Sequence, residues 1–226
     1  MEFNLLSAPG YWMIPATDIN AASYQHHLGG VCRLAGAVSP YTTRPFAQLA
    51  RIDCSDPKLP LQQTGLPFIS LLFSGDSEYL SGSFIYKLHP QKIEIISFLS
   101  DGYISPIAFS GFSQEIAIDL VALSDAEQAR ISHLNQPENA DDAVNTPSGQ
   151  MTSDEPRHQL LGEPFRLYSD RIPPRCPECN ALMGFLAAFG DENCVNSGGL
   201  WGDPYVQVIY EICMACHIVK VNQFAD

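Results

Sequence analysis

The stretch Gly202-Asp-Pro-Tyr-Val-Gln-Val-Ile-Tyr-Glu-Ile-Cys-Met-Ala-Cys-His-Ile-Val-Lys-Val221 decides the fold of this chain. The apolar run over 205–212 predicts a strand, and 217–221 predicts the strand that returns beside it. The turn between them carries Cys213 and Cys216. A hairpin whose turn holds a Cys-x-x-Cys motif is typical of one half of a zinc ribbon. The stretch therefore predicts strand-rich, antiparallel structure built around a metal.

A second motif, Cys176-Pro-Glu-Cys179, supplies the other two sulfurs of a tetrahedral site. The 33 residues between the motifs exceed the usual spacing of about 15 to 20. Doubling a loop costs only about 0.6 kcal/mol of closure entropy, so this length is tolerable. Asn180 follows the first motif, and Asn tolerates the left-handed backbone that such turns often need.

We therefore predict that Cys176, Cys179, Cys213 and Cys216 bind a structural Zn²⁺, because four sulfur ligands leave no open position for a catalytic water. A redox Cys-x-x-Cys pair is an alternative, but it usually precedes a helix, and neither motif is followed by a convincing helical pattern. The four thiols could also be buried without a metal.

Two further residues bear on the zinc hypothesis. Cys194 and His217 are possible substitute ligands. The remaining two of the seven cysteines, Cys32 and Cys54, are interpreted as core residues.

Composition limits the classes of function. The chain has 226 residues, of which 46% are hydrophobic and 16% charged, as in an ordinary globular protein. Its net charge of −13 repels nucleic acid and anionic membranes, and it speeds association with a basic protein. No apolar run reaches the roughly 18 residues of a membrane span, and no basic residue precedes Arg33 as a signal peptide would require. We expect a cytoplasmic protein.

Three elements near the N-terminus recur in the same order in the second half of the chain. Residues 26–30 (His-His-Leu-Gly-Gly) recur as 158–162 (His-Gln-Leu-Leu-Gly) at an offset of 132, 45–52 recur as 182–189 at 137, and 65–73 recur as 202–210 at 137. This pattern predicts an internal duplication; the alternative is two unrelated strand-rich stretches with the same turn chemistry. The recurrence of His158 at the place of His26 favours a turn-supporting role for His26 over a role in a site.

The predicted fold class is α+β and β-rich, with two related halves. The halves span 1–134, which includes a loosely structured or partner-packed lead-in over 1–25, and 158–226, which carries the cysteine motifs; a polar, acidic linker over 135–157 joins them. Further strands are expected at 65–73, 83–88, 93–99 and 116–123. Ser124 and Glu127 form a capping box that predicts a short helix, whereas 45–53 fits a helix or a strand equally.

The repeated elements resemble the YwqG-like proteins, which share a superfamily with the eukaryotic programmed-cell-death-2 proteins. The resemblance covers 26–73 and 158–217 and departs from the family pattern at Arg51, where Gln is usual, and at 188–190. It implies a β-rich α+β fold of two related halves and no enzyme activity. Eukaryotic relatives are thought to escort a ribosomal protein, and bacterial relatives have been suggested as immunity proteins beside polymorphic toxins.

The expected function is therefore protein binding. We expect a cytoplasmic immunity protein that occludes the active site of a basic toxin; the alternatives are an escort for a basic ribosomal protein and an unrecognised enzyme. No GxSxG, P-loop, HExxH or GxGxxG motif occurs, and we expect no enzyme activity.

The contact surface is expected in the loops around Gly29 and Gly30, in the acidic segment 138–155 and in the aromatic lead-in. The aromatic residues that could form a binding face, or alternatively pack in the core, are Tyr11, Trp12, Tyr24 and Trp201.

Overall fold

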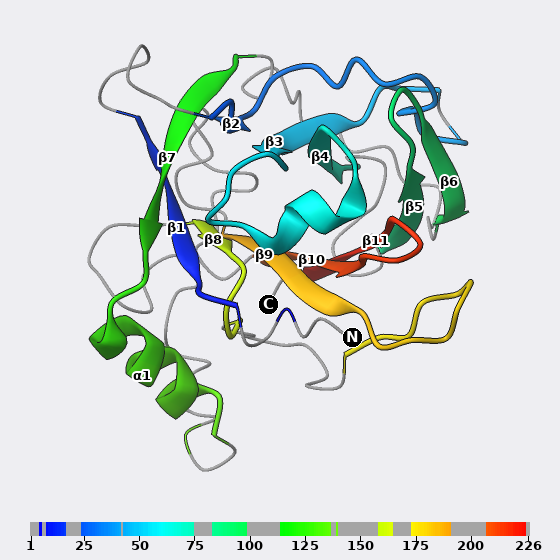
Figure 1. Ribbon diagram of the computed structural model, residues 1–226. Coiled ribbons are helices and arrows are strands. Elements are labelled where there is room, and N and C mark those ends of the chain that lie inside the picture. The colour runs from blue at the N-terminus through cyan, green and yellow to red at the C-terminus, as the bar shows by residue number, and fades with distance from the viewer. Residues whose placement is uncertain are drawn as a thin grey trace.

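Eleven strands form in the described part of the computed structural model, and most of them carry β-branched or aromatic residues (Figure 1). The structure describes residues 5, 8–16, 24–41, 43–74, 83–98, 114–136, 139, 158–164, 173–190 and 207–224. The strands are β1 (Tyr11–Pro15), β2 (His27–Leu28), β3 (Ala47–Asp53), β4 (Phe68–Phe73), β5 (Phe84–Leu88), β6 (Ile93–Phe98), β7 (Ile116–Ala122), β8 (His158–Leu160), β9 (Gly184–Gly190), β10 (Gln207–Cys213) and β11 (Ile218–Phe224).

These strands make one curled antiparallel sheet in the order β4-β3-β2-β7-β1-β8-β9-β10-β11-β5-β6. The strands expected at 65–73, 83–88, 93–99, 116–123, 205–212 and 217–221 are present as β4, β5, β6, β7, β10 and β11. The ambiguous segment 45–53 is the strand β3. A β-rich fold is thus confirmed.

One α-helix occurs in the described ranges, α1 (Asp125–Leu134), and its capping box is formed as predicted. The Ser124 hydroxyl accepts the Glu127 N–H, and the Glu127 carboxylate accepts the Ser124 N–H at 2.7 Å. Ile131 and Leu134 pack against Trp12 on the outside of the sheet. The Trp12 indole N–H donates to Glu127 at 2.8 Å, which fixes the helix to β1.

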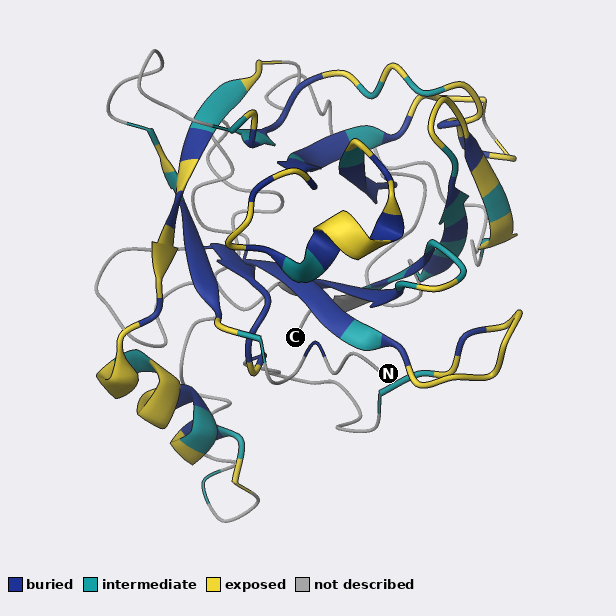
Figure 2. Ribbon diagram, viewed as in Figure 1, coloured by how far each residue is buried: buried dark blue, intermediate teal, exposed yellow. Residues whose placement is uncertain are grey.

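The expectation of a loosely structured lead-in over 1–25 is wrong for Tyr11–Pro15. This segment is β1, which lies inside the sheet between β7 and β8. Tyr11 and Met13 pack in the main core, whereas Trp12 packs against residues of α1. The first three residues of β1 are buried, and the ribbon of β1 is mostly dark blue in Figure 2. A run of four large apolar residues suits a strand covered on both faces, and the breakers Pro9 and Pro15 flank it rather than disrupt it.

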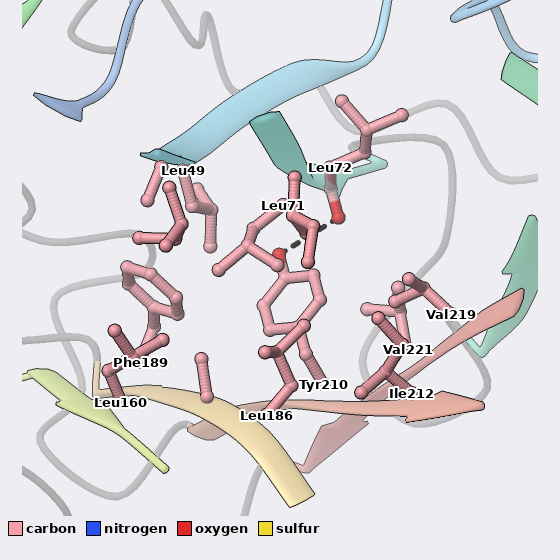
Figure 3. Close-up of a cluster of buried hydrophobic side chains, with 14 of the residues drawn as sticks. Leu49, Leu71, Leu72, Leu160, Leu186, Phe189, Tyr210, Ile212, Val219 and Val221 are labelled. Carbon is pink, nitrogen blue, oxygen red and sulfur yellow. Dashed lines mark hydrogen bonds between the residues drawn. The ribbon is translucent and has the colours of Figure 1, made fainter. Parts of the chain in front are cut away.

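The main core fills the inside of the curl. Side chains from β3 and β4 meet side chains from β8 to β11 across it (Figure 3). Among the described strands, β4 pairs only with β3, and tyrosine hydroxyls reach its second edge. Tyr86 donates to the Ser70 carbonyl at 2.7 Å, and Tyr210 donates to the Leu72 carbonyl at 2.8 Å. These two bonds satisfy buried carbonyl groups of β4.

The strand groups β2-β3-β4 and β8-β9-β10 share a pairing pattern. Leu28 pairs with Ala50 in the first group, and Leu160 pairs with Ala187 in the second. Each group has a bulge that leaves one leucine of its middle strand unpaired, Leu49 in β3 and Leu186 in β9. The carbonyl of that leucine accepts a 2.8 Å bond from the N–H of Gly29 or Leu161, respectively.

The last strands of the two groups, β4 and β10, do not pair at the offset of 137 residues that the sequence repeat predicts. Asp53 pairs with Phe68, but Gly190 pairs with Gln207 rather than with the residue 137 positions after Phe68. β10 is therefore displaced by two residues relative to the echo between 65–73 and 202–210.

Both halves of the sequence contribute to this single sheet. β5 and β6, from the first half, extend it beside β11, from the second half. Of the expected linker 135–157, only 135, 136 and 139 lie in the described ranges, so the boundaries at 134 and 158 stay sequence-based predictions. Within the described part of the chain, no helix has the length and apolar character needed to span a bilayer.

Candidate metal centre

The first cysteine motif lies in a short hairpin before β9. An antiparallel bridge between Arg175 and Leu182 closes the hairpin. Inside it, the Cys176 N–H donates to the Ala181 carbonyl at 2.8 Å, and the Asn180 N–H donates to the Cys176 carbonyl at 2.9 Å. Asn180 has φ of 60°, so the left-handed conformation predicted for it is confirmed.

The second motif forms the turn between β10 and β11. Cys213 ends β10, and His217 follows the motif with φ of 56°. His217 thus stands in the same place relative to Cys216 as Asn180 does relative to Cys179. This left-handed residue was missed at the sequence level, although its equivalent position after the second cysteine was the available signal. The His217 carbonyl accepts the Leu88 N–H at 2.9 Å, which joins the turn to β5.

The two turns bring four sulfurs together, and we call Cys176, Cys179, Cys213 and Cys216 the cysteine centre. Their sulfur atoms all lie within 4.8 Å of one another, and those of Cys179 and Cys213 are 3.6 Å apart. A tetrahedral site with metal–sulfur distances of about 2.3 Å would separate its sulfurs by about 3.8 Å. None of the cysteines in the described ranges forms a disulfide. The cysteine centre could therefore hold a metal ion.

The cysteine centre has an apolar side and a solvent side. Cys176 and Cys213 are buried and pack with Met183, Ile218 and Ile85. Cys216 is half-buried, and Cys179 is exposed. A metal there would be held at the protein surface, with two ligands anchored in the packed end of the sheet.

The thiols of the cysteine centre differ in acidity. A hydrogen bond from the Ala181 backbone, followed by hydrogen bonds from the three neighbouring thiols, lowers the pKa of Cys179 to about 7. Burial raises the pKa of Cys213 and of Cys216. Since metals bind the thiolate, the lowered pKa of Cys179 favours metal binding near neutral pH.

Two residues, His217 and Cys194, are the proposed substitute ligands. His217 is not among the four residues whose ligand atoms converge, and Cys194 lies outside the described residues. The core interpretation agrees with Cys54, which is 1% exposed and whose pKa is raised to about 12 by burial. Cys32 is half-buried and packs against the main core.

His26 supports a turn. Its imidazole is buried, Nδ1 accepts the Asp53 N–H at 3.1 Å, and Nε2 lies 3.0 Å from Asp56. Both ring nitrogens are thus engaged inside the protein. His158 is also buried, with its ring 4.8 Å from that of Phe189.

A cavity of about 350 Å³ lies between α1 and the ends of β1 and β8, lined by Gly10, Ile131 and Glu163 among others. The Glu163 carboxylate accepts the Ser132 hydroxyl at 2.6 Å and the Asn135 amide at 3.0 Å. The lining thus combines a carboxylate, the Ser132 hydroxyl and the Gln128 amide with apolar residues.

The expected contact surface is described only in part. Gly29 and Gly30 are buried, whereas Val31 beside them is 60% exposed. Tyr11 and Trp12 are buried, which agrees with the core-packing alternative for these aromatic residues. Tyr24 is half-buried, whereas Trp201 and the segment 138–155, except for Asn139, lie outside the described residues.

The negative charge is unevenly distributed along the sequence. The described ranges contain fewer than half of the 25 acidic residues but nine of the 12 basic ones. Most of the acidic excess therefore belongs to segments outside those ranges, such as 138–155.

No family model matches the sequence, and no curated protein is significantly similar to it.

Proposed function

We propose that this chain is a zinc-stabilised, non-enzymatic protein-binding module. The observation that supports zinc is the convergence of four cysteine sulfurs within 4.8 Å of one another. Thiolates are soft ligands that suit Zn²⁺, and zinc accepts a tetrahedral arrangement without an electronic preference of its own. Four sulfurs fill that arrangement, so the ion would be structural.

The role of the ion follows from the places of its ligands. The first motif precedes β9, and the second joins β10 to β11. A zinc ion would therefore connect the start of β9 to the β10–β11 turn, at the end of the sheet where β11 meets β5. Such a link takes the place of hydrophobic packing at the surface, where Cys179 is exposed.

The metal content of the protein tests this proposal. We expect about one zinc per chain after purification without added metal, and none in a Cys176→Ser, Cys213→Ser double variant. Cys32→Ser is the matched control, because that thiol is half-buried and outside the cysteine centre. A metal-free wild-type protein with four freely titrating thiols would overturn the zinc site.

The partner is proposed to be a basic protein, most concretely a toxin domain whose active site this chain occludes in the cytoplasm. The net charge of −13 supports a cationic partner. Membership of the YwqG-like family belongs to the same proposal. The proposal also includes an internal duplication that gave rise to the strand groups β2-β3-β4 and β8-β9-β10. The pairing pattern and the bulge that the two groups share support this duplication.

Affinity purification of the tagged protein from its native host, followed by mass spectrometry, tests the partner. A single stoichiometric basic toxin domain that is released at high salt would support immunity. A ribosomal protein would favour the escort alternative. Recovery of no protein would overturn both.

A further inference from the structure

The outward face of β5 lies against the cysteine centre. Its inward residues are buried in the main core, whereas Ile85 and Lys87 alternate with them and face outward. Ile85 packs against the cluster that contains Cys176 and Cys213. Lys87 lies two residues further along, opposite Ile218 of β11. Together they form one wall of the centre, supplied by a strand far away in sequence.

Lys87 also forms an ion pair with a residue of the first cysteine motif. Its ammonium lies 2.7 and 2.8 Å from the two carboxylate oxygens of Glu178. Glu178 stands between Cys176 and Cys179 and is 91 residues from Lys87 along the chain. A side chain of β5 thus fixes the turn that would present two of the four ligands.

The ion pair between Lys87 and Glu178 has a second role when the cysteine centre holds a metal ion, because the metal–thiolate complex is negatively charged. One divalent ion with four thiolates carries a net charge of −2, and Glu178 adds another negative charge beside it. An ammonium group close by offsets that excess. Arg175 is a further cation near the first motif, but its guanidinium is exposed and donates to the Asn180 carbonyl at 2.9 Å.

We propose that Lys87 is a positioning residue of the metal centre, which orients the first cysteine motif through Glu178 and offsets the negative charge of the metal–thiolate complex. This inference rests on the proposed metal site. It assigns to β5 a function in metal binding that neither cysteine motif reveals in the sequence.

The expected effect separates metal binding from folding. An exposed ion pair adds little to the stability of a metal-free protein. Partners that orient metal ligands, in contrast, change metal affinity by about 10- to 100-fold when they are removed. Loss of Lys87 should therefore weaken zinc binding while leaving the unfolding of the metal-free protein nearly unchanged.

The test is a competition for zinc between the protein and a chromophoric chelator. We expect Lys87→Met to bind zinc about 10-fold or more weakly than wild type and Lys87→Arg, which keeps the charge, to recover much of the affinity. Lys92→Met is the matched control, because Lys92 is exposed on the same hairpin and has no contact with the centre among the described residues. Binding of Co²⁺ should retain the spectrum of a tetrahedral thiolate site in each variant.

Two results would overturn the inference while leaving the zinc site intact. The first is an equal zinc affinity of Lys87→Met and Lys92→Met. The second is a melting temperature of metal-free Lys87→Met that is lowered enough to account for its weaker zinc binding. If wild-type protein binds neither zinc nor Co²⁺, the proposed metal site itself fails, and the role of Lys87 fails with it.

Discussion

The Tyr210 hydroxyl donates a 2.8 Å hydrogen bond to the carbonyl oxygen of Leu72, 138 residues away in the sequence (Figure 3). Both residues are fully buried, and the bond crosses the inside of the curled sheet from β10 to β4. Tyr86 does the same for the Ser70 carbonyl. Tyrosine side chains thus bond the carbonyl groups at the edge of β4 that does not pair with β3.

Removing this hydroxyl should destabilise the protein. Tyr210→Phe keeps the ring but leaves the Leu72 carbonyl buried without its donor, which costs about 1–3 kcal/mol of unfolding free energy. Urea unfolding of both forms measures the difference. Tyr41→Phe is the control, because Tyr41 is 63% exposed and its loss should stay within about 0.5 kcal/mol. A Tyr210→Phe variant as stable as Tyr41→Phe would contradict the stabilisation of β4 by this bond.

The backbones of Gly162 and Gly10 lie close together, which predicts that an alanine at 162 destabilises the protein more than an alanine at 65. Gly162 has φ of 78°, and a β-carbon there would lie 2.7 Å from the Gly10 α-carbon. Gly65 has φ of 66° but open space around it. Both alanine variants bear the left-handed cost of about 1–2 kcal/mol, and only Gly162→Ala also forces β1 and β8 apart.

Chemical denaturation of the two alanine variants compares them directly. We expect Gly162→Ala to lose clearly more stability than Gly65→Ala. Equal losses would mean that β1 and β8 do not approach as closely as the structure places them.

Metal removal should lower the stability of the folded protein only when the cysteine centre is intact. A ligand that binds only the folded state stabilises it by about 4 kcal/mol at 1,000 times its dissociation constant. Treatment with a chelator should therefore lower the melting temperature of wild-type protein. The Cys176→Ser, Cys213→Ser variant should melt at a low temperature with or without chelator. An equal drop in both proteins would show that the chelator acts elsewhere.

Local chemistry explains which parts of the structure could be predicted from sequence. The spacing of each Cys-x-x-Cys motif confines two sulfurs to one turn, and Asn180 signals the left-handed residue that ends the first turn. His217 is the left-handed residue that ends the second turn, and its position after the second cysteine was the available signal. The capping box of Ser124 and Glu127 is similarly local and was predicted.

Long-range pairing explains what could not be predicted. The place of β1 between β7 and β8 depends on partners about 110 and 150 residues away, which no local pattern encodes. The two-residue displacement of β10 likewise arises from pairing with β9, although the sequence echo suggests a common offset. The contact between Lys87 and Glu178 is invisible in sequence for the same reason, since a lysine on a strand ordinarily faces solvent.

The buried thiol of Cys54 predicts a pH dependence of stability. Burial raises its pKa from 9.0 to about 12, so the folded protein keeps the proton at pH values where the unfolded chain releases it. Stability from this group is complete below pH 9 and falls as the pH rises toward 12, by about 1.4 kcal/mol per unit. Urea unfolding of wild type and Cys54→Val at pH 8 and pH 10 should show a steeper loss for wild type. Parallel losses would mean that the Cys54 thiol ionises in the folded protein and is less buried than its 1% exposure indicates.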